Sequence, residues 1–374
     1  MPGRRSTPNW RHPLVDDETY FAIPPYSLDK VKKQTFLSET LCGLTRHHYQ
    51  ACPAYRRILD AMQFDTTRAC SYYDLPFLPV RLFKEYELLS VDKADVVKTM
   101  TSSGTSGQQV SKIFLDKATA ARQTKALSRI VASYIGPKRL PMLILDTPAV
   151  LKSRTTFSAR GAGILGFSMF SRERIYALDE NMELDREAIT AFLQEHLGKD
   201  ILVFGFTFIV WQHFYKELVR TGFRPDLSKG TMLHGGGWKK LLDEAVSPAD
   251  FKRSLHEVCG IQRVYDYYGM VEQTGSVYME CEHGHLHASI FSDVIIRRAK
   301  DFSVADTGEK GIVQVVSILP GSYPGHALLT EDEGILLGED DCPCGRLGKY
   351  FKTCGRLQNA DIRGCSDTYA VQTR

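Results

Sequence analysis

A hydroxyl-rich loop with two glycines is the first segment of this sequence whose residue types could do chemistry. Residues 99–112 read TMTSSGTSGQQVSK, and the loop residues that we expect to face a ligand are Ser103, Gly104, Thr105, Ser106 and Gly107. Glycine allows the backbone to turn N–H groups towards phosphate oxygens, and the hydroxyls add further donors. The pattern therefore favours a nucleotide phosphate site. It is not a Walker loop, because Gln108 and Gln109 follow the second glycine, and a plain Ser/Gly surface loop is the alternative.

Two further motifs follow apolar segments and could bind the rest of a nucleotide. Gly236 lies in HGGGW (234–238), where the missing side chains leave room for a flat ring against the backbone. The segment YDYYGMVEQTG (265–275) contains Tyr268, whose ring could stack on a base. It also contains Glu272, whose carboxylate could hold a Mg²⁺ ion on the phosphates of ATP. A glycine turn and structural core tyrosines are the alternatives.

Cysteines and histidines form two short clusters in the last third of the chain. The segment CEHGHLH begins at Cys281 and ends at His287, and DCPCGR contains Cys342 and Cys344. These four residues could form a tetrahedral zinc site, which would brace the structure and not perform catalysis. Exposed histidines near a hairpin would give the same pattern, and Cys-x-Cys is less typical of zinc sites than Cys-x-x-Cys.

Composition restricts the class of protein. Of the 374 residues, 43% are hydrophobic and 24% are charged, which is ordinary for a folded globular protein. The net charge is only +3, so neither nucleic acid nor an anionic membrane is expected as the main partner. No apolar stretch reaches the roughly 20 residues that span a bilayer, and no signal peptide is evident. We therefore expect a cytoplasmic protein whose nine cysteines are reduced thiols.

Three regions with different patterns must position these motifs. Residues 1–94 space their apolar residues in helical fashion, which predicts a helical N-terminal layer. Residues 95–287 alternate apolar runs with helical segments, one of them at 117–134. This alternation predicts an α/β body that binds ligands, here the nucleotide expected from the motifs, at the carboxyl ends of its strands. Residues 288–374 contain short β-branched runs, which predict a β-rich subdomain and a C-terminal tail.

A glycine-rich segment offers a rival interpretation. Gly161, Gly163 and Gly166 match the dinucleotide-binding pattern G-x-G-x-x-G, and acidic residues follow at a suitable distance. The preceding TTFSAR does not resemble a buried strand, and the match is short enough to arise by chance. A dehydrogenase remains the rival enzyme class.

In their order along the chain, these motifs resemble those of the adenylate-forming superfamily. The series continues with LLTEDEG (328–334) and CGRLQNADIRG (354–364). The resemblance is closer to the LuxE family of acyl-protein synthetases, and more distant to phenylacetate-CoA ligases, through LPFLPVRLFK (75–84), SSGTSG, HGGGWKK and RGCSDT. It implies an α/β adenylate-forming fold of the N-terminal type with a β-rich subdomain. Because only eleven residues follow Arg363, we expect no full C-terminal mobile domain.

The resemblance also implies roles for individual residues, with ATP and Mg²⁺ as cofactors. The hydroxyl and glycine loop would bind the ATP phosphates, and Gly236 and Tyr268 would frame the adenine. Glu272 would bind Mg²⁺, Asp332 the ribose hydroxyls, and Arg356 ribose or phosphate. Val271 stands where the family usually has threonine, so one phosphate contact differs.

The same resemblance implies a ligase that activates a long-chain fatty acid as acyl-AMP. Residues 95–287 would then form the nucleotide- and acyl-binding body, and the glycine-rich segment 161–166 would line the acyl pocket. In this family the acyl group moves to a cysteine near the C-terminus and then to an acyl-protein reductase, and Cys365 is the matching residue. A thiolate would attack the mixed anhydride, and Arg363 would favour the thiolate form. An inert thiol is the alternative for Cys365. Ligation to CoA or a carrier-protein thiol, and a non-catalytic scaffold subunit, are the alternative functions.

Overall fold

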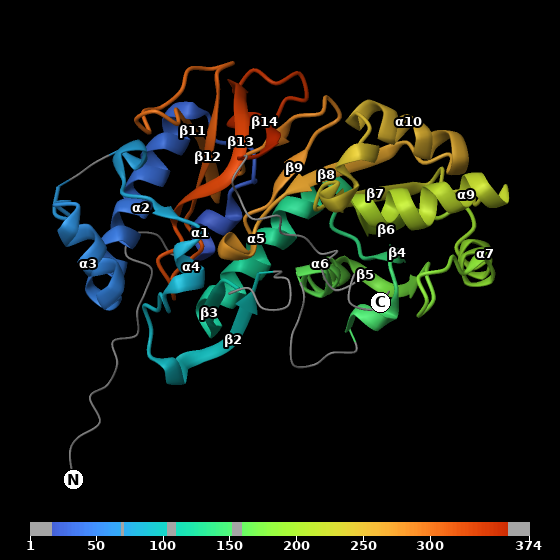
Figure 1. Cartoon of the computed structure of the whole chain (residues 1–374), viewed down its shortest axis with the longest axis horizontal. Helices are drawn as coiled ribbons and strands as arrows, with labels where there is room; N and C mark the ends of the chain where they lie inside the picture. Colours follow the sequence, from blue (N-terminus) through green and yellow to red (C-terminus); the bar gives the residue numbers. More distant parts are fainter. Residues whose placement is uncertain (1–16, 69–70, 103–109, 152–158, 358–374) are drawn as a thin grey trace, which may run out of the picture.

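The computed structural model describes residues 17–68, 71–102, 110–151 and 159–357. Its main feature is a twelve-stranded mixed sheet with the order β11-β12-β13-β14-β10-β9-β8-β7-β6-β4-β5, in which β1 pairs with β13 (Figure 1). The strands of this sheet are β1 (Leu78–Pro79), β4 (Leu140–Leu145), β5 (Ser171–Tyr176), β6 (Ile201–Phe206), β7 (Gly230–Gly235), β8 (Arg263–Tyr268), β9 (Tyr278–Glu280), β10 (Leu286–His287), β11 (Ser292–Arg297), β12 (Lys310–Ser317), β13 (Ala327–Glu339) and β14 (Lys349–Arg356). A separate antiparallel pair consists of β2 (Val96–Thr101) and β3 (Lys112–Asp116).

Helices cover this sheet and connect its strands. They are α1 (Asp17–Ala22), α2 (Lys30–Ala51), α3 (Pro53–Ala61), α4 (Leu82–Glu85), α5 (Lys117–Ile135), α6 (Ala159–Phe167), α7 (Arg186–Glu195), α8 (Thr207–Ile209), α9 (Lys216–Thr221) and α10 (Pro248–Cys259). A π-helical stretch, Val210–Tyr215, joins α8 to α9. Within the described ranges, no helix is both long enough and apolar enough to cross a membrane.

Local sequence explains why α5 forms where the pattern predicts a helix. The Asp116 side chain caps its first turn by accepting a hydrogen bond from the backbone N–H of Thr119, at 2.8 Å. Gly136 ends it with a φ of +82°, a conformation that costs glycine little. The buried face includes Ala126, Ile130 and Val131. The expected helix at 117–134 is therefore confirmed as Lys117–Ile135.

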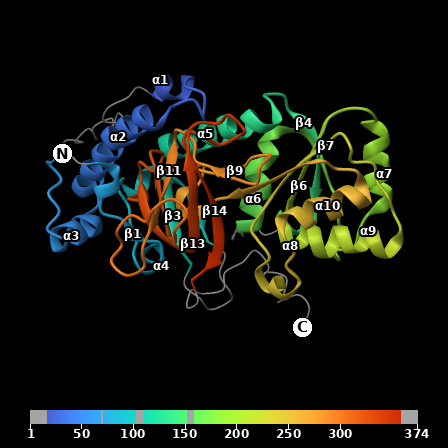
Figure 2. The ribbon, with the colours of Figure 1, turned by 90° about the horizontal axis from the view of Figure 1, so that it is seen from above.

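The central parallel strands β4 and β6 are apolar throughout because helices cover both of their faces. Strands β5, β4, β6, β7 and β8 run parallel. In β4, Met142 and Ile144 pack into the cluster that contains residues of α5 and α6. The alternate residues Leu143 and Leu145 pack with α7, α9 and α10 on the other face (Figure 2). A strand buried on both faces loses the polar alternation of a half-exposed strand.

A buried ion cluster ties α2 to the antiparallel part of the sheet. The carboxylate of Asp293, on β11, lies 3.2 Å from Lys33 of α2 and 3.1 Å from Lys349 of β14. The hydroxyl of Tyr72 also donates to it. Burial alone would raise the pKa of Asp293, but the two ammonium groups hold it down at about 2. The carboxylate therefore interacts favourably with both ammonium groups where water is excluded.

Two buried imidazoles connect α2 to the segment before β13. The Nε2 atom of His326 lies 2.9 Å from the hydroxyl of Thr45, and Nδ1 of His48 lies 2.8 Å from that of Ser90. The two rings stack at 4.9 Å. Burial lowers the pKa of His326 to about 3 and lowers that of His48 well below its ordinary value of 6.5. His326 is therefore neutral in the folded protein at pH 5 to 7, and the folded protein protonates His48 less readily than the unfolded chain does.

Acidification should destabilise the protein through these residues. Since the unfolded chain binds a proton on each imidazole below pH 6.5 and the folded chain does not, stability falls as pH falls below 6.5. For His326 the loss between neutral pH and pH 5 is about 2 kcal/mol. Between pH 7.5 and pH 5, the unfolding free energy of His326→Gln should fall by about 2 kcal/mol less than that of the wild type. Urea denaturation at both pH values measures this difference. Equal decreases in both proteins would contradict this assignment.

Candidate active site

Two neighbouring parallel strands bring the glycine motif beside the aromatic motif. In β7 and β8, Gly235 is in register with Tyr267, so Gly236 and Tyr268 follow at adjacent strand ends. A Cβ atom on Gly235 would lie 2.8 Å from the Tyr267 ring and 2.9 Å from its carbonyl oxygen, which explains why this position has no side chain. Gly236 then adopts a φ of +84° and Gly237 one of +64°. The backbone therefore turns out of the sheet at its carboxyl edge, where ligands of such folds bind.

A hydrogen-bonded group joins three of the predicted nucleotide-binding residues. The Tyr268 hydroxyl donates to Oδ2 of Asp332 at 2.7 Å, and Nε of Arg356 lies 3.5 Å from Oδ1 of the same carboxylate. Asp332 and Arg356 are register partners in β13 and β14. Burial, and then the neighbouring carboxylate, raise the pKa of Tyr268 well above 10, so it remains a donor. We refer to these three residues as the Tyr268 group.

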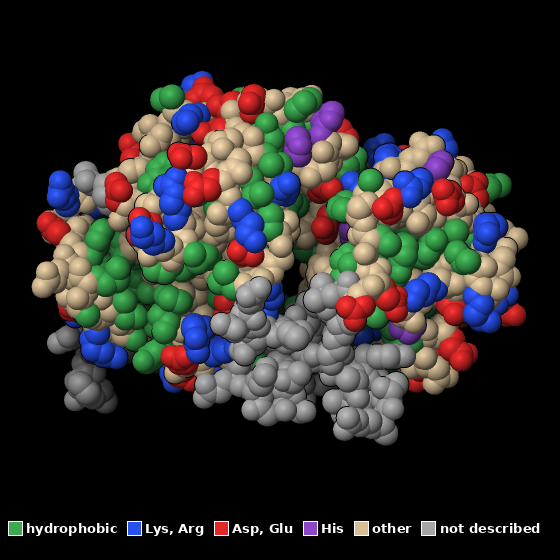
Figure 3. All heavy atoms as spheres, turned by 45° about the horizontal axis from the view of Figure 1, so that its top comes forward, with side chains coloured by type: hydrophobic (Ala, Val, Ile, Leu, Met, Phe, Trp, Pro, Cys, Tyr) green, Lys and Arg blue, Asp and Glu red, His purple; other side chains and the backbone are tan. Residues whose placement is uncertain are grey.

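The Tyr268 group remains accessible to a ligand. The side chain of Asp332 is 21% exposed and that of Arg356 is 36% exposed. Strand β8 lies between the antiparallel strands and α10 in Figure 1, and the surface is hollowed between these two parts (Figure 3). A partly exposed carboxylate can accept hydrogen bonds from a diol, and a guanidinium can donate to hydroxyl or phosphate oxygens. The arrangement therefore suits a sugar phosphate.

Glu272 lies in a short 3₁₀ turn, Val271–Gln273, that follows β8. Glu272 is buried, with 4% of its surface exposed. Two hydrogen bonds hold the turn: Tyr323 donates its hydroxyl to the Glu272 carbonyl at 2.9 Å, and the side-chain amide of Gln273 donates to the Gly325 carbonyl at 2.9 Å. A carboxylate on a turn fixed in this way can hold a cation without reorganising.

Two groups of predicted site residues lie outside the described part of the chain. These are the loop residues Ser103, Gly104, Thr105, Ser106 and Gly107, and the C-terminal Cys365. The strands beside the loop are described, and they pair so that Thr101 is in register with Lys112. Backbone hydrogen bonding continues to Ser102, whose N–H donates to the Ser111 carbonyl at 3.2 Å. The chain therefore enters the loop from β2 and leaves it into β3, and the roles of the loop and of Cys365 stay predictions.

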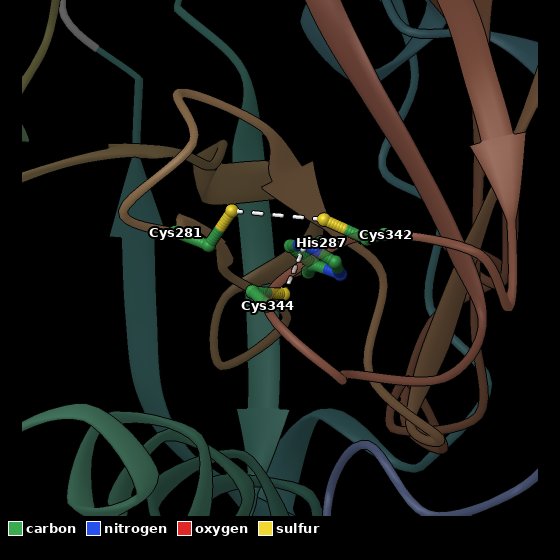
Figure 4. A group of neighbouring side chains, drawn as sticks. All are labelled: Cys281, His287, Cys342 and Cys344. Atoms are coloured by element: carbon green, nitrogen blue, oxygen red, sulfur yellow. Dashed lines mark hydrogen bonds between the residues drawn. The ribbon is translucent and has the colours of Figure 1, made fainter.

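The two cysteine and histidine clusters come together in space. Cys281 follows β9, His287 ends β10, and Cys342 and Cys344 lie between β13 and β14 (Figure 4). Their ligand atoms all lie within 4.8 Å of one another. His285 also approaches this group, with Nδ1 3.2 Å from the sulfur of Cys342, and His283 lies on the same hairpin.

The segment with the rival dinucleotide pattern does not have the structure that this pattern requires, a glycine loop between a strand and a helix. Gly161, Gly163 and Gly166 lie within α6 and not in a loop before a helix. A Cβ atom on Gly163 would lie 2.9 Å from the ring of Phe206, so this glycine permits close packing of α6 on β6. The interpretation as a dehydrogenase fingerprint is therefore wrong for this segment.

Sequence patterns did not single out several residues that support the site. Asp146, at the carboxyl end of β4, forms a buried ion pair with Arg160 of α6. A charged residue directly after an apolar run was the available signal. Tyr323, which supports the turn of Glu272, also accepts a hydrogen bond from Gln123 of α5 at 3.2 Å. Its partners are far away in sequence, so no local signal could have identified them.

Comparison with solved structures defines the class of fold. A crystal structure of 2-hydroxyisobutyryl-CoA ligase in the postadenylation state, in complex with 2-HIB-AMP, matches with a TM-score of 0.70 at 15% identity, covering 94% of this chain and 75% of that one. An open conformation of that ligase, in complex with 2-HIB-AMP and CoA, matches with a TM-score of 0.67, covering 94% and 77%. The chain therefore has the α/β fold of adenylate-forming ligases, and the predicted fold class is confirmed.

Comparison of sequences defines the family. The family model described as "Acyl-protein synthetase, LuxE" matches residues 13–372, so this chain belongs to the LuxE acyl-protein synthetase family. A relative from Vibrio harveyi, named long-chain-fatty-acid–luciferin-component ligase, is 23% identical over 372 residues, covering 94% of this chain and 92% of the relative. A relative of the same name from Aliivibrio fischeri is 23% identical over 320 residues, covering 78% and 77%. The resemblance drawn from the motifs is thus confirmed.

Proposed function

We propose that this protein uses ATP to convert a long-chain fatty acid to acyl-AMP, and then transfers the acyl group to Cys365 and on to an acyl-protein reductase. The observation that carries the proposal is the Tyr268 group, which joins a tyrosine, a carboxylate and a guanidinium from β8, β13 and β14 in an adenylate-forming fold. Membership of the LuxE family and the names of its two relatives support the fatty acid as substrate.

The first step requires positioning more than covalent catalysis. A fatty acid carboxylate attacks the α-phosphorus of ATP, the bond from that phosphorus to the bridging oxygen breaks, and pyrophosphate leaves. Asp332 would accept hydrogen bonds from the ribose hydroxyls, and Arg356 would donate to ribose or phosphate oxygens. Gly236 and Tyr268 would border the adenine, and the loop Ser103–Gly107 would donate to the phosphates. These fixed groups lower the barrier because they need no reorganisation.

The turn that carries Glu272 fits a role in binding Mg²⁺. The carboxylate of Glu272 is a hard oxygen ligand. The hydrogen bonds that Tyr323 and Gln273 donate hold the turn in place. Glu272 would hold the ion beside the phosphates of ATP. When bound, Mg²⁺ would neutralise part of the negative charge on the departing pyrophosphate.

The second step is attack by a thiolate on the acyl carbonyl carbon. The bond from that carbon to the phosphate oxygen breaks, AMP leaves, and a thioester forms. Cys365 is the proposed nucleophile because it lies in RGCSDT, where Arg363 provides a positive charge two residues away. A second thiol exchange would then pass the acyl group to the reductase partner.

Intact-mass spectrometry of the wild-type protein tests this function. We expect that incubation with ATP, Mg²⁺ and a panel of fatty acids adds the mass of one acyl chain, and that hydroxylamine removes it. Pyrophosphate release without an adduct would favour a diffusible acceptor such as CoA or a carrier-protein thiol. The absence of both pyrophosphate release and an adduct would favour a scaffold subunit and contradict the proposal.

The Tyr268 group should control affinity for ATP. A hydrogen bond to a charged group contributes about 1.5–3 kcal/mol, so Asp332→Asn should raise the KM for ATP by about 10-fold to 100-fold in a pyrophosphate exchange assay. Tyr268→Phe should cause a smaller increase. Because the two side chains contact each other, the double variant should lose less than the sum of the single effects. Additive losses would show that they act separately.

A further inference from the structure

The four residues Cys281, His287, Cys342 and Cys344 have the geometry of a metal site. Bond lengths of about 2.3 Å for Zn–S and 2.0–2.1 Å for Zn–N give tetrahedral edges of about 3.8 Å between sulfurs and about 3.6 Å between sulfur and nitrogen. The Cys281 and Cys342 sulfurs are 3.9 Å apart, and the Cys344 sulfur is 3.3 Å from Nε2 of His287 (Figure 4). The side chains therefore point towards one common centre.

The backbone of both loops is arranged around these thiols. The N–H of Cys281 donates to the His285 carbonyl at 2.8 Å, and the N–H of His283 donates to the Cys281 sulfur at 3.4 Å. In the other loop, the N–H of Gly345 donates to the Cys342 carbonyl at 3.0 Å, and Gly345 has a φ of +78°. Each loop is thus a tight turn that presents its cysteine at the end of a hairpin, as preformed metal-binding turns do.

The donor set selects the kind of metal. Three thiols and one imidazole are soft or borderline ligands, which suit Zn²⁺ and do not suit the oxygen-preferring Mg²⁺ or Ca²⁺. With no water or substrate needed as a fourth ligand, a Cys₃His set matches a closed, structural zinc site. A disulfide is the competing explanation, but the Cys281 and Cys342 sulfurs are far beyond the roughly 2.05 Å of an S–S bond.

The position in the sheet indicates what the metal would do. Strands β9 and β10 lie between β8, the last of the parallel strands, and β14, and β10 pairs through only two residues with β9 and two with β14. The four ligands come from the β9–β10 hairpin and from the β13–β14 connection, so one ion would link both sides of β10. At about 3.3 Å per residue, β13 places Glu339 roughly 20 Å from Asp332, with Cys342 beyond it. The site is therefore distant from Asp332, whereas Tyr268 lies nearer to it, because Tyr268 pairs with Tyr278, three residues before Cys281.

We propose that Cys281, His287, Cys342 and Cys344 bind one structural Zn²⁺ ion that fastens the parallel and antiparallel parts of the sheet together at β10. Because the unfolded chain does not hold the ligands together, binding of the ion stabilises the folded state. The proposal does not depend on the substrate or on Cys365.

Metal analysis of the purified, tag-free protein tests this site directly. We expect about one zinc ion per chain by inductively coupled plasma mass spectrometry, as for a closed structural site. Replacing zinc by Co²⁺ should produce the d–d absorption of tetrahedral cobalt together with thiolate charge-transfer bands. Wild-type protein that contains no zinc after purification in zinc-supplemented buffer, or that forms a Cys281–Cys342 disulfide, would overturn the proposal.

Matched variants then test the ligand assignment. We expect His287→Asn, and the double variant Cys342→Ser with Cys344→Ser, to lose the zinc and to have a lower Tm. The controls His285→Asn and Cys354→Ser should retain it. His285 approaches the Cys342 sulfur but lies outside the four residues whose ligand atoms are all close to one another, and Cys354 is an exposed thiol on β14. Zinc retained in His287→Asn and lost in His285→Asn would overturn the assignment of the fourth ligand. If a variant does not fold, a decrease in the Tm of the wild-type protein after chelation tests whether a bound metal stabilises the fold.

Discussion

Cys365→Ser should abolish the ATP-dependent acyl adduct and leave the formation of acyl-AMP intact. A serine hydroxyl is a much weaker nucleophile than a thiolate when no general base is beside it. The first half-reaction does not use this residue, so pyrophosphate exchange should stay within about twofold of the wild type. Intact-mass spectrometry with hydroxylamine treatment measures the first effect, and isotope exchange between pyrophosphate and ATP measures the second.

A matched thiol control makes this result specific. Cys354 is an exposed free cysteine on β14, and it lies eleven residues before Cys365 in the chain. We expect Cys354→Ser to be acylated as fast as the wild type. Acylation that persists in Cys365→Ser and disappears in Cys354→Ser would move the acceptor role to β14. Loss of pyrophosphate exchange in Cys365→Ser would show that this residue acts before acyl transfer.

Glu272→Gln should lower the rate of pyrophosphate exchange by about 100-fold to 1,000-fold, the usual cost of removing one charge-stabilising group from an active site. Glutamine preserves the shape of the side chain but removes the negative charge that would hold Mg²⁺. The Mg²⁺ concentration needed for half-maximal exchange should therefore rise. Titration of Mg²⁺ at saturating ATP and fatty acid separates this effect from weaker substrate binding.

The buried position of Glu272 requires a test of folding beside the test of activity. Its backbone turn is held by Tyr323 and Gln273, and these hydrogen bonds do not involve the carboxylate. We therefore expect Glu272→Gln to change the Tm by only a few degrees. Glu257→Gln, which alters an exposed carboxylate on α10, is the control and should exchange at the wild-type rate. A rate within threefold of wild type in Glu272→Gln would remove Glu272 from the proposed mechanism.

The zinc proposal and the proposed function make separable claims about this molecule. The Cys365 and Glu272 experiments follow catalysis at the carboxyl edge of β7 and β8, whereas metal content reports on the β10 junction. A zinc-free protein that still forms acyl-AMP would leave the proposed function unchanged. A zinc-bound protein without activity would leave the metal site unchanged.

Local sequence determined the elements of this protein where the signal lies within one segment. The cap at Asp116 and the stop at Gly136 define α5, and continuous apolar runs define β4 and β6. The order of short motifs was enough to predict the family, because each motif carries its own chemistry. Two cysteine and histidine clusters were visible for the same reason. In α6, however, three glycines suggested a dinucleotide-binding loop but lie in a helix, where Gly163 allows close packing on Phe206.

Only the tertiary structure decided which of these elements meet. Tyr268 reaches Asp332 across 64 positions in the chain, and Cys281 approaches Cys342 across 61. Both contacts depend on strand order, since β9 and β10 insert between β8 and β14. Hydrophobic periodicity states which face of a strand is buried but not which strand lies beside it, because neighbouring strands are chosen by packing and hydrogen bonding of the whole sheet. The chemistry of each residue is therefore local, and the sites it forms are a property of the fold.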